Sequence, residues 1–270
     1  MEPYWQSDDG RHVIYQGNCL EVLPMLGTVD CVVTDPPYGH NNNNNGDLIH
    51  RREAALGRGP HGEARAIAND GREANSLYRE ALPLLYALLK PGGCCCCCGG
   101  GGPDPQFARW ALWMDEVFRF KQMVVWDKGP MGMGWHYRRS YETVLVGEKP
   151  GARCAWYGGN AIENIIRPGA YGIRKIIPSS QQHPCAKPVE LYQHFIQLHS
   201  QADDIILDHF AGDGPCGSAC IRTGRRFIGI EIDEAYCSRA VRRLEAEMQQ
   251  LLLLAPAPVS APAPHQERLL

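Results

Sequence analysis

The sequence has no apolar run approaching the roughly 20 residues that a membrane-spanning helix requires. Its first residues, MEPYWQSDDGRH, are polar and acidic, where a secretory signal would be basic and then apolar. With 270 residues, of which 44% are hydrophobic and 21% are charged, the chain can bury a full core. We therefore expect a soluble, cytosolic globular protein with no membrane partner.

The sequence also lacks cysteine spacing of a kind that would build a disulfide framework or a zinc site. Five of its 12 cysteines form one block, Cys94–Cys98, whose neighbours would point to opposite faces of a strand. No CxxC pair is followed by a second pair or by paired histidines at ligand spacing. We expect neither disulfides nor a bound metal.

Two low-complexity runs, Asn41–Asn45 and Cys94–Gly102, are unlike ordinary core or loop sequence, and we assign no chemistry to them. The first begins a long polar loop, residues 39–71. Loops in such a place often close over a substrate, and an unstructured segment is the alternative.

An overall excess of positive charge is missing as well, because the formal net charge is −3. The charge is nevertheless uneven, since residues 119–175 hold ten Lys or Arg against four Asp or Glu. Aromatic residues interleave with these charges, which makes the segment a candidate surface for nucleic acid. A solvated surface without function is the alternative.

Short apolar runs bounded by turn residues recur along the chain, and most of them lack alternation. Such runs are typical of strands buried on both faces, as in a parallel sheet flanked by helices. We expect strands at residues 12–15, 30–34, 94–98, 122–126, 143–146, 205–207 and 227–232.

Helical spacing of apolar residues predicts helices between several of these strands. One helix carries an apolar stripe from Leu77 to Leu88 and should end near Lys90, because Pro91-Gly92-Gly93 follows. Others are expected from 187 to about 199 and from 234 to about 253. The Ala- and Pro-rich tail, residues 255–270, should be disordered.

The tetrapeptide Asp35-Pro36-Pro37-Tyr38 directly follows the apolar run at 30–34. Two consecutive prolines fix φ and remove two backbone donors, so a carboxylate and an aromatic ring stand at fixed positions on a stiff corner. Such a corner can hold a nucleobase by its exocyclic amine. A strand followed by an ordinary Pro-Pro turn is the alternative.

A second candidate corner lies downstream, where Phe210-Ala211-Gly212-Asp213-Gly214 follows an expected strand that ends at Asp208. Glycines let the backbone approach a ligand, and the helix that opens near Pro215 offers unpaired N–H groups. Glu231 ends the next strand, near the spacing at which nucleotide-binding folds hold a ribose. The pattern indicates a nucleotide site, and a strand-end acid in water is the alternative for Glu231.

The order of these motifs resembles that of the DNA amino-methyltransferases of the beta arrangement, whose motifs are circularly permuted. The resemblance covers roughly residues 12–250. It is carried by DPPY, the basic aromatic segment, His183-Pro184-Cys185-Ala186-Lys187-Pro188 and FAGDG. Gly17-Asn18-Cys19, LKPGG, Val125-Trp126-Asp127-Lys128 and Arg139-Ser140-Tyr141-Glu142 add to it.

This resemblance implies an α/β class I methyltransferase fold with a Rossmann-like sheet of about seven mostly parallel strands, flanked by helices and carrying a small target-recognition insert. It also implies S-adenosylmethionine as methyl donor and transfer to the exocyclic amine of a base flipped out of double-stranded DNA. An aspartate at the first motif position is more similar to adenine-N6 enzymes than to cytosine-N4 enzymes, which more often have serine there. We expect adenine N6 as the target, with cytosine N4 as the alternative.

The resemblance assigns the catalytic corner to Asp35, Pro36, Pro37 and Tyr38. Asp35 and the Pro36 carbonyl would accept the two N–H groups of the amine, Tyr38 would stack on the flipped base, and transfer would be direct. The expected cofactor-binding residues are Asn18, Asp35, Lys187, Asp208, Phe210, Gly212, Gly214 and Glu231. Among them, Asn18 is expected near the adenine, Glu231 on the ribose and Lys187 facing the methionine carboxylate, with a surface lysine opening a helix as the alternative for Lys187.

We expect residues 1–127 to form the catalytic half and residues 181–254 the cofactor-binding half. Residues 128–180 form the candidate target-recognition region, with a strand at 142–147 that belongs to the sheet. The candidate DNA contacts are His136, Tyr137, Arg138, Arg139 and Arg174, and an exposed side chain without function is the alternative for each. Double-stranded DNA is the expected partner, and homodimerisation is left open.

The chain departs from the family pattern mainly on the cofactor side. The family usually has Asp at Asn18, Pro at His209, Ser at Asp213, Thr-Thr at Pro215-Cys216, Thr at Cys185 and His at Tyr141. A carboxylate at Asp213 would repel the methionine carboxylate unless it turns away. A DNA-binding protein with weak cofactor binding is therefore a second hypothesis, and a methyltransferase of RNA or protein amines is a third.

Overall fold

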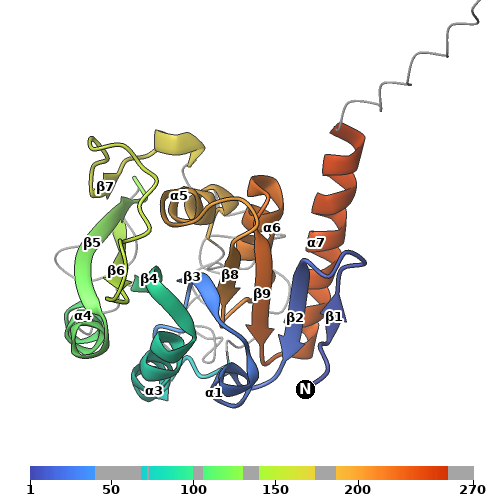
Figure 1. Ribbon diagram of the computed structural model, residues 1–270, viewed down its shortest axis with the longest axis horizontal. Helices are drawn as coiled ribbons and strands as arrows, with labels where there is room; N and C mark the ends of the chain where they lie inside the picture. Colours follow the sequence, from blue (N-terminus) through green and yellow to red (C-terminus); the bar gives the residue numbers. More distant parts are fainter. Residues whose placement is uncertain (40–67, 72, 100–105, 130–139, 174–186, 255–270) are drawn as a thin grey trace, which may run out of the picture.

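A computed structural model describes residues 1–39, 68–71, 73–99, 106–129, 140–173 and 187–254. Its strands form one nine-stranded sheet in the order β1-β2-β9-β8-β3-β4-β6-β5-β7 (Figure 1). The seven long strands are β2 (His12–Gln16), β3 (Val29–Thr34), β4 (Leu89–Gly99), β5 (Arg119–Asp127), β6 (Tyr141–Glu148), β8 (Ile205–Asp208) and β9 (Arg226–Glu231). Each edge adds a two-residue strand, β1 (Trp5–Gln6) or β7 (Ile165–Ile166). The predicted sheet of about seven strands is confirmed, with these short additions.

Strand direction brings the functional motifs to one edge of the sheet. β2, β9, β8, β3 and β4 pair in parallel, while β6 is antiparallel to both β4 and β5. The carboxyl ends of the parallel strands therefore share an edge with the first residues of β6. Strand order also changes direction between β8 and β3, and in open α/β sheets this switch point is where ligands bind.

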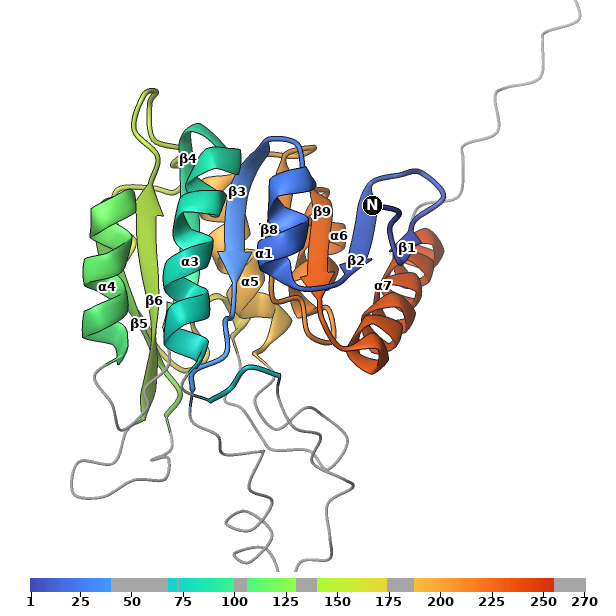
Figure 2. The same ribbon diagram turned by 90° about the horizontal axis from the view of Figure 1, so that it is seen from below.

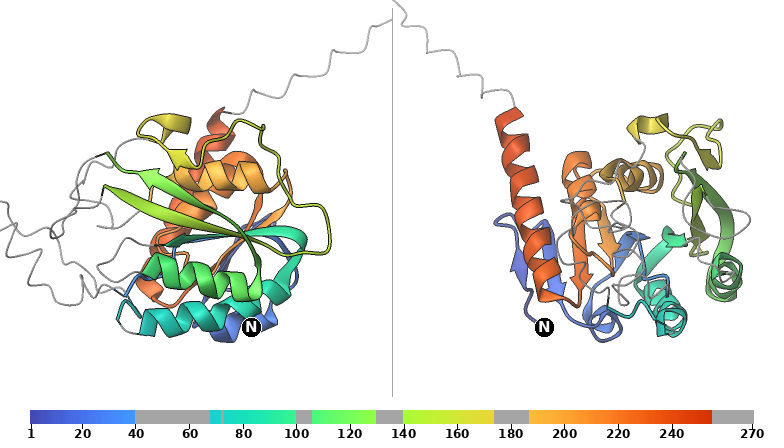
Figure 3. Two further views of the ribbon diagram at one scale, coloured as in Figure 1. Left: turned by 90° about the vertical axis from the view of Figure 1, so that its left-hand side faces the viewer. Right: turned by 180° about the vertical axis from the view of Figure 1, so that it is seen from behind.

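Helices cover both faces of the sheet (Figures 1 and 2). One face carries α1 (Cys19–Val22), the 3-10 turn η1 (Leu23–Met25), α3 (Glu73–Leu88) and α4 (Gln106–Val117). The other carries α5 (Val189–His199), α6 (Pro215–Thr223) and α7 (Glu234–Leu254), with the short turn η2 (Ala170–Gly172) beside α5. Figure 3 shows α7 at the end of the molecule that carries β1 and β2, opposite β5 and β7. Two apolar cores result, one on each face of the sheet.

Two predicted helix boundaries differ from the structure. The helix expected to end near Lys90 ends at Leu88, because Pro91-Gly92-Gly93 already belongs to β4, where Gly92 N–H donates to the Lys149 carbonyl at 2.7 Å. The helix expected from residue 187 begins at Val189, after Pro188, so Lys187 lies just before the helix. The tail, residues 255–270, lies outside the described residues.

The cysteine block forms the middle of β4 and divides between the two cores. Cys96 and Cys98 face the core on the α5 side with Cys31, and Cys95 and Cys97 face the other. The 11 cysteines of the described ranges are free thiols. Within those ranges no three His, Cys, Asp or Glu side chains gather as metal ligands would. None of the helices described is both long enough and apolar enough to cross a membrane.

Candidate functional site

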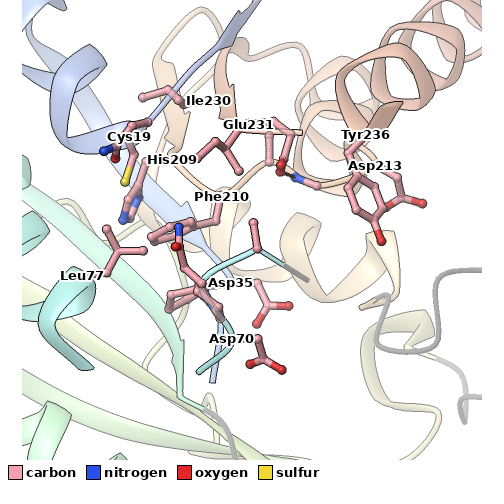
Figure 4. Close-up of a pocket in the computed structure, with 18 of the residues that line it drawn as sticks. Cys19, Asp35, Asp70, Leu77, His209, Phe210, Asp213, Ile230, Glu231 and Tyr236 are labelled. Carbon is pink, nitrogen blue, oxygen red and sulfur yellow. Dashed lines mark hydrogen bonds between the residues drawn. The ribbon is translucent and has the colours of Figure 1, made fainter. Parts of the chain in front are cut away.

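A cavity of about 160 Å³ lies at the switch point, where the carboxyl ends of β3, β8 and β9 meet. Both predicted corners contribute to its wall. Asp35-Pro36-Pro37-Tyr38 comes from the end of β3, Phe210–Asp213 from the turn after β8, and Glu231 from the end of β9. Figure 4 shows Asp35 and Asp70 on one side of the cavity and Glu231, Asp213 and Tyr236 on the other. Residues that the sequence separates by nearly 200 positions thus share one site.

The two corners are joined behind the cavity by a buried hydrogen bond. The hydroxyl of Thr34, the last residue of β3, donates to Asp208 Oδ1 at 2.7 Å. The same oxygen accepts the Phe210 N–H at 3.1 Å. Asp208 is fully buried, and burial raises the pKa of its carboxyl to about 7, against the opposing effect of these two hydrogen bonds. Asp208 therefore links the two corners and does not line the cavity.

The carboxylate of Asp35 is held from two sides. The Tyr38 hydroxyl donates to Oδ1, and the Lys187 ammonium donates to Oδ2 at 2.9 Å. Lys187 also lies 3.1 Å from Glu142 Oε2, and its nitrogen is 4.9 Å from the centre of the Tyr38 ring. Glu142 Oε1 accepts a hydrogen bond from Lys128 at 2.6 Å. Asp35, Lys187, Glu142 and Lys128 form a charge cluster of alternating sign.

The cluster keeps Lys187 and Glu142 ionised although both are largely buried. Burial by itself lowers the pKa of Lys187, but the carboxylates of Asp35 and Glu142 outweigh it and hold that pKa well above its ordinary value. Burial acts to raise the pKa of Glu142, and the ammonium groups of Lys187 and Lys128 reverse this and lower it to about 2. The Lys187 side chain is only 3% exposed, so its charge depends on these partners.

The second corner holds Glu231 by its backbone. Glu231 Oε2 accepts the Gly212 N–H at 2.9 Å, and Oε1 accepts the Asp233 N–H at 2.9 Å. Burial raises the pKa of Glu231 in spite of these donors. Gly212 has φ of +53°, a conformation that glycine adopts readily, and it turns its N–H toward the carboxylate. The acid that ends β9 is thereby fixed at the cavity wall, where it can accept hydroxyl groups.

Asp213, the residue expected to repel an anionic ligand, has a counter-charge. Its Oδ2 lies 2.8 Å from the guanidinium of Arg243 on α7. The Asp213 side chain is 16% exposed, so this pairing takes place in a partly desolvated wall. The ion pair removes most of the net negative charge that the departure from the family pattern would bring to the cavity.

Comparison with known proteins gives the family of the chain. A family model described as DNA methylase, the N6/N4 methyltransferase model, matches residues 29–242. The chain belongs to the N6/N4 DNA methyltransferase family.

The family's relatives include the type II methyltransferase M2.MboI of Moraxella bovis, which is 25% identical over 90% of this chain and 91% of its own length. The DNA adenine methyltransferase YhdJ of Escherichia coli is 28% identical over 48% of this chain and 54% of its own. Among solved structures, the M1.HpyAVI complex with S-adenosylmethionine is 22% identical and matches with a TM-score of 0.60 over 86% of this chain and 98% of that one. The cytosine-N4-specific PvuII DNA methyltransferase is 17% identical and matches with a TM-score of 0.64 over 93% of this chain and 95% of that one. The predicted class I methyltransferase fold is confirmed.

The methyl donor of this DNA methyltransferase family is S-adenosylmethionine, and the cavity has the chemistry to hold it. Glu231 offers carboxylate oxygens suited to ribose hydroxyls, while Phe210, Ile230 and Ile232 offer apolar wall for an adenine ring. Asn18 also lines the cavity, although its side-chain oxygen already caps α1 by accepting the Leu20 N–H at 3.1 Å. The residues present therefore fit the cofactor.

Most of the predicted site residues of this methyltransferase meet in the cavity. The predicted residues that line it are Asn18, Asp35, Pro36, Pro37, Tyr38, Lys187, Phe210, Gly212 and Glu231. The other two, Asp208 and Gly214, stand behind the wall, Asp208 between β3 and β8 and Gly214 against α7. The candidate DNA contacts His136, Tyr137, Arg138, Arg139 and Arg174 lie outside the described residues. So do Asn41–Asn45 and most of the loop at 39–71.

Several lining residues were not predicted. Asp70 accepts the Gly39 N–H at 2.8 Å and so joins the two ends of the loop at 39–71. Tyr192 comes from α5, Tyr236 from α7 and His209 from the turn after β8. Burial lowers the pKa of His209 to about 3, so its imidazole is neutral. No local pattern marks these residues, because each reaches the cavity through the packing of its own element.

Proposed function

We propose that this chain transfers a methyl group from S-adenosylmethionine to the exocyclic N6 amine of adenine in double-stranded DNA. The observation that carries the proposal is the position of Asp35-Pro36-Pro37-Tyr38, which lines the same cavity as Phe210, Gly212 and Glu231. An acceptor for an amine thus lies beside a corner suited to a nucleoside. The aspartate at the first position of the motif, and a relative named as a DNA adenine methyltransferase, favour N6 of adenine.

The corner residues have complementary roles in this proposal. The cofactor supplies a methyl group on a positively charged sulfur. Asp35 accepts one N–H of the amine and the Pro36 carbonyl accepts the other, which favours the pyramidal nitrogen whose lone pair forms the new N–C bond. The donor would give up its methyl group and keep the electron pair of the C–S bond, and Asp35 and water would take the N–H proton that the amine loses. Tyr38 stacks on the base, which offsets part of the few kcal/mol that unstacking costs.

The rigidity of the corner supplies the alignment that direct transfer needs. Pro36 and Pro37 fix the backbone, and Tyr38 and Lys187 fix the two oxygens of Asp35. On the cofactor side, Glu231 holds the ribose, Asn18 lies near the adenine, and Phe210 and Gly212 contact the nucleoside and methionine. Asp208 and Gly214 support these residues from behind. Lys187 can face the methionine carboxylate with its third N–H donor while it keeps its contacts with Asp35 and Glu142.

The decisive experiment incubates the protein with labelled S-adenosylmethionine and mixed-sequence double-stranded DNA and identifies the modified nucleoside after digestion. N6-methyladenine is the expected product. N4-methylcytosine would instead support cytosine-N4 methylation. Label on added RNA or protein alone would support methylation of an amine outside DNA. DNA binding without any incorporation would indicate a DNA-binding protein that has lost turnover.

A variant of the corner tests the role of Asp35. Asp35→Asn keeps the shape of the side chain and removes its charge, so we expect transfer to fall by about 100-fold or more, since a neutral amide is a poor acceptor and can present an N–H to the amine. Affinity for S-adenosylhomocysteine, measured by calorimetry, should change by less than about threefold. An unchanged rate would contradict the role of Asp35.

A further inference from the structure

Four charged side chains from four separate elements form the charge cluster behind the amine-holding corner. Asp35 follows β3, Lys187 precedes α5, Glu142 lies at the start of β6, and Lys128 follows β5. Their contacts run in sequence at 2.9, 3.1 and 2.6 Å, with signs that alternate. The side chains are 19%, 3%, 16% and 33% exposed, from Asp35 through Lys187 and Glu142 to Lys128. Two charges in the middle of the cluster are therefore shielded from water and depend on their neighbours.

Each contact fixes the next group in place. Tyr38 and Lys187 hold one oxygen each of Asp35, so the direction of its remaining lone pairs depends on where the ammonium of Lys187 lies. Glu142 Oε2 forms an ion pair with the same ammonium at 3.1 Å, and Lys128 donates a hydrogen bond to the other oxygen of Glu142. A displacement of a reacting group by about 1 Å can cost about 100-fold in rate, so this arrangement bears on catalysis.

We propose that Glu142 and Lys128 are positioning residues for methyl transfer, which hold the Lys187 ammonium against Asp35 and so orient the carboxylate that accepts the target amine. This inference rests on the proposed function, because it assigns a role within the same site. Neither residue lines the cavity, and both act through Lys187.

The chain supplies a matched control on the same strand. Glu148, at the other end of β6, is also a buried glutamate that pairs with two cations, Arg119 at 3.3 Å and Lys121 at 2.9 Å. Its side chain is 3% exposed, and it lies at the opposite edge of the sheet from Asp35. If these buried glutamates only stabilised the fold, Glu142→Gln and Glu148→Gln would change the rate of methyl transfer equally.

The first test compares these two variants in single-turnover methyl transfer. Glu142→Gln should lower the rate by about 10- to 100-fold, because the ammonium of Lys187 loses one of its two anchors. The dissociation constants for S-adenosylhomocysteine and DNA should stay within about threefold. Glu148→Gln should keep the rate within about twofold of the wild-type rate, even if both variants have lower melting temperatures.

A pH profile separates positioning from general loosening. Among the described residues, the titratable groups that act on Lys187 are Asp35 and Tyr38 from the corner, Cys98 on β4, Glu142 on β6 and Tyr192 on α5. Only two of them are carboxylates, and these oppose the effect of burial on the ammonium. Glu142→Gln should therefore lower the pKa of Lys187 and move the alkaline decline of the rate to lower pH. Glu148→Gln should keep the wild-type profile.

Lys128 gives a second route if Glu142→Gln does not fold. Lys128→Met should lower the single-turnover rate by roughly tenfold, and Lys128→Arg should restore most of it, because the charge is retained. Equal rates and equal pH profiles in folded Glu142→Gln and Glu148→Gln, with an active wild type, would overturn the positioning inference alone. A wild-type protein that transfers no methyl group would remove the proposed function and this inference together.

Discussion

Three carboxylates of the site, Asp35, Glu231 and Asp213, are balanced in different ways. Asp35 is held by a tyrosine hydroxyl and a buried ammonium, Glu231 by backbone N–H groups, and Asp213 by the guanidinium of Arg243. Unpaired charges in a partly desolvated wall would repel one another and shift toward the neutral form. The partners of these acids, as much as the acids themselves, therefore decide what the cavity can bind.

Replacement of Arg243 tests most directly how the pairing of charges affects ligand binding. Arg243→Met leaves the Asp213 carboxylate uncompensated at the cavity wall, so we expect affinity for S-adenosylhomocysteine to fall by about fivefold to tenfold, through repulsion of its carboxylate. Calorimetry at low ionic strength measures the effect, which added salt should reduce. The double variant with Asp213→Asn should recover the affinity.

A nearby ion pair provides the control for this prediction. Arg222 on α6 pairs with Glu247 on α7 at 2.7 and 3.0 Å, and neither residue lines the cavity. Arg222→Met should leave the affinity within about twofold. If Arg222→Met and Arg243→Met weakened binding equally, loss of α6–α7 docking and not charge would be the cause.

At the scale of elements, α6 is the piece that fixes the cofactor corner. Its N-cap residue, Gly214, has φ of +82° and lies so close to α7 that an added Cβ would stand 2.9 Å from Leu244 Cδ1 and 3.1 Å from Ala240 Cβ. At the other end of the same helix, Gly224 has φ of +71° and open space around it. The first glycine is required both by the turn and by helix packing, the second by the turn alone.

This difference makes a paired prediction. Gly224→Ala should cost about 1–2 kcal/mol of unfolding free energy, the penalty of a left-handed conformation. Gly214→Ala should cost roughly 1–3 kcal/mol more, because the methyl group overpacks against α7. Only Gly214→Ala should also weaken cofactor binding, because it displaces the turn that carries Gly212. Denaturant unfolding and calorimetry give both quantities, and equal costs for the two variants would argue against the packing contact.

Some elements follow from local pattern and others do not. The strands at 12–15, 30–34, 122–126, 143–146 and 205–207 were predicted within one to three residues at each end, because short apolar runs between turns have few alternatives. Helix α4 was not predicted, although Trp110 and Met114 within it and Phe118 directly after it are buried at four-residue spacing. The buried residues of α4 pack against α3, where Trp110 stacks on Tyr78 with ring centres 4.1 Å apart. This contact between two helices stabilises α4 and cannot be read from the local sequence.

At the scale of the whole molecule, Asp208 affects both the stability of the fold and the structure of the site. This residue ends β8 and accepts a hydrogen bond from Thr34 at the end of β3. Its raised pKa of about 7 means that the folded protein holds a proton that the unfolded chain releases near pH 4. Unfolding therefore releases a proton between these values, and the contribution of Asp208 to stability falls as pH rises from about 4 to about 7.

Asp208→Asn should remove this dependence, since an amide can still accept from Thr34 and Phe210. The difference in unfolding free energy between variant and wild type should grow in favour of the variant by roughly 3 kcal/mol from about pH 4.5 to about pH 8. Denaturant titrations at both pH values measure it. Taking the difference cancels the opposite contribution of His12, His194 and His209, whose lowered pKa values destabilise the fold in acid. A difference that does not vary with pH would contradict the buried, protonated state.

The amino-acid sequence by itself determined the two corners, because each is a local arrangement in which prolines, glycines and a strand end impose their own geometry. It also determined the family and the expectation that Asp35 and Glu231 belong to one site. Only the tertiary structure decided which charges meet, since Lys187 reaches Asp35 across 152 positions and Arg243 reaches Asp213 across 30. Such pairs depend on strand order and helix docking, and no local pattern encodes the distance between side chains on separate elements.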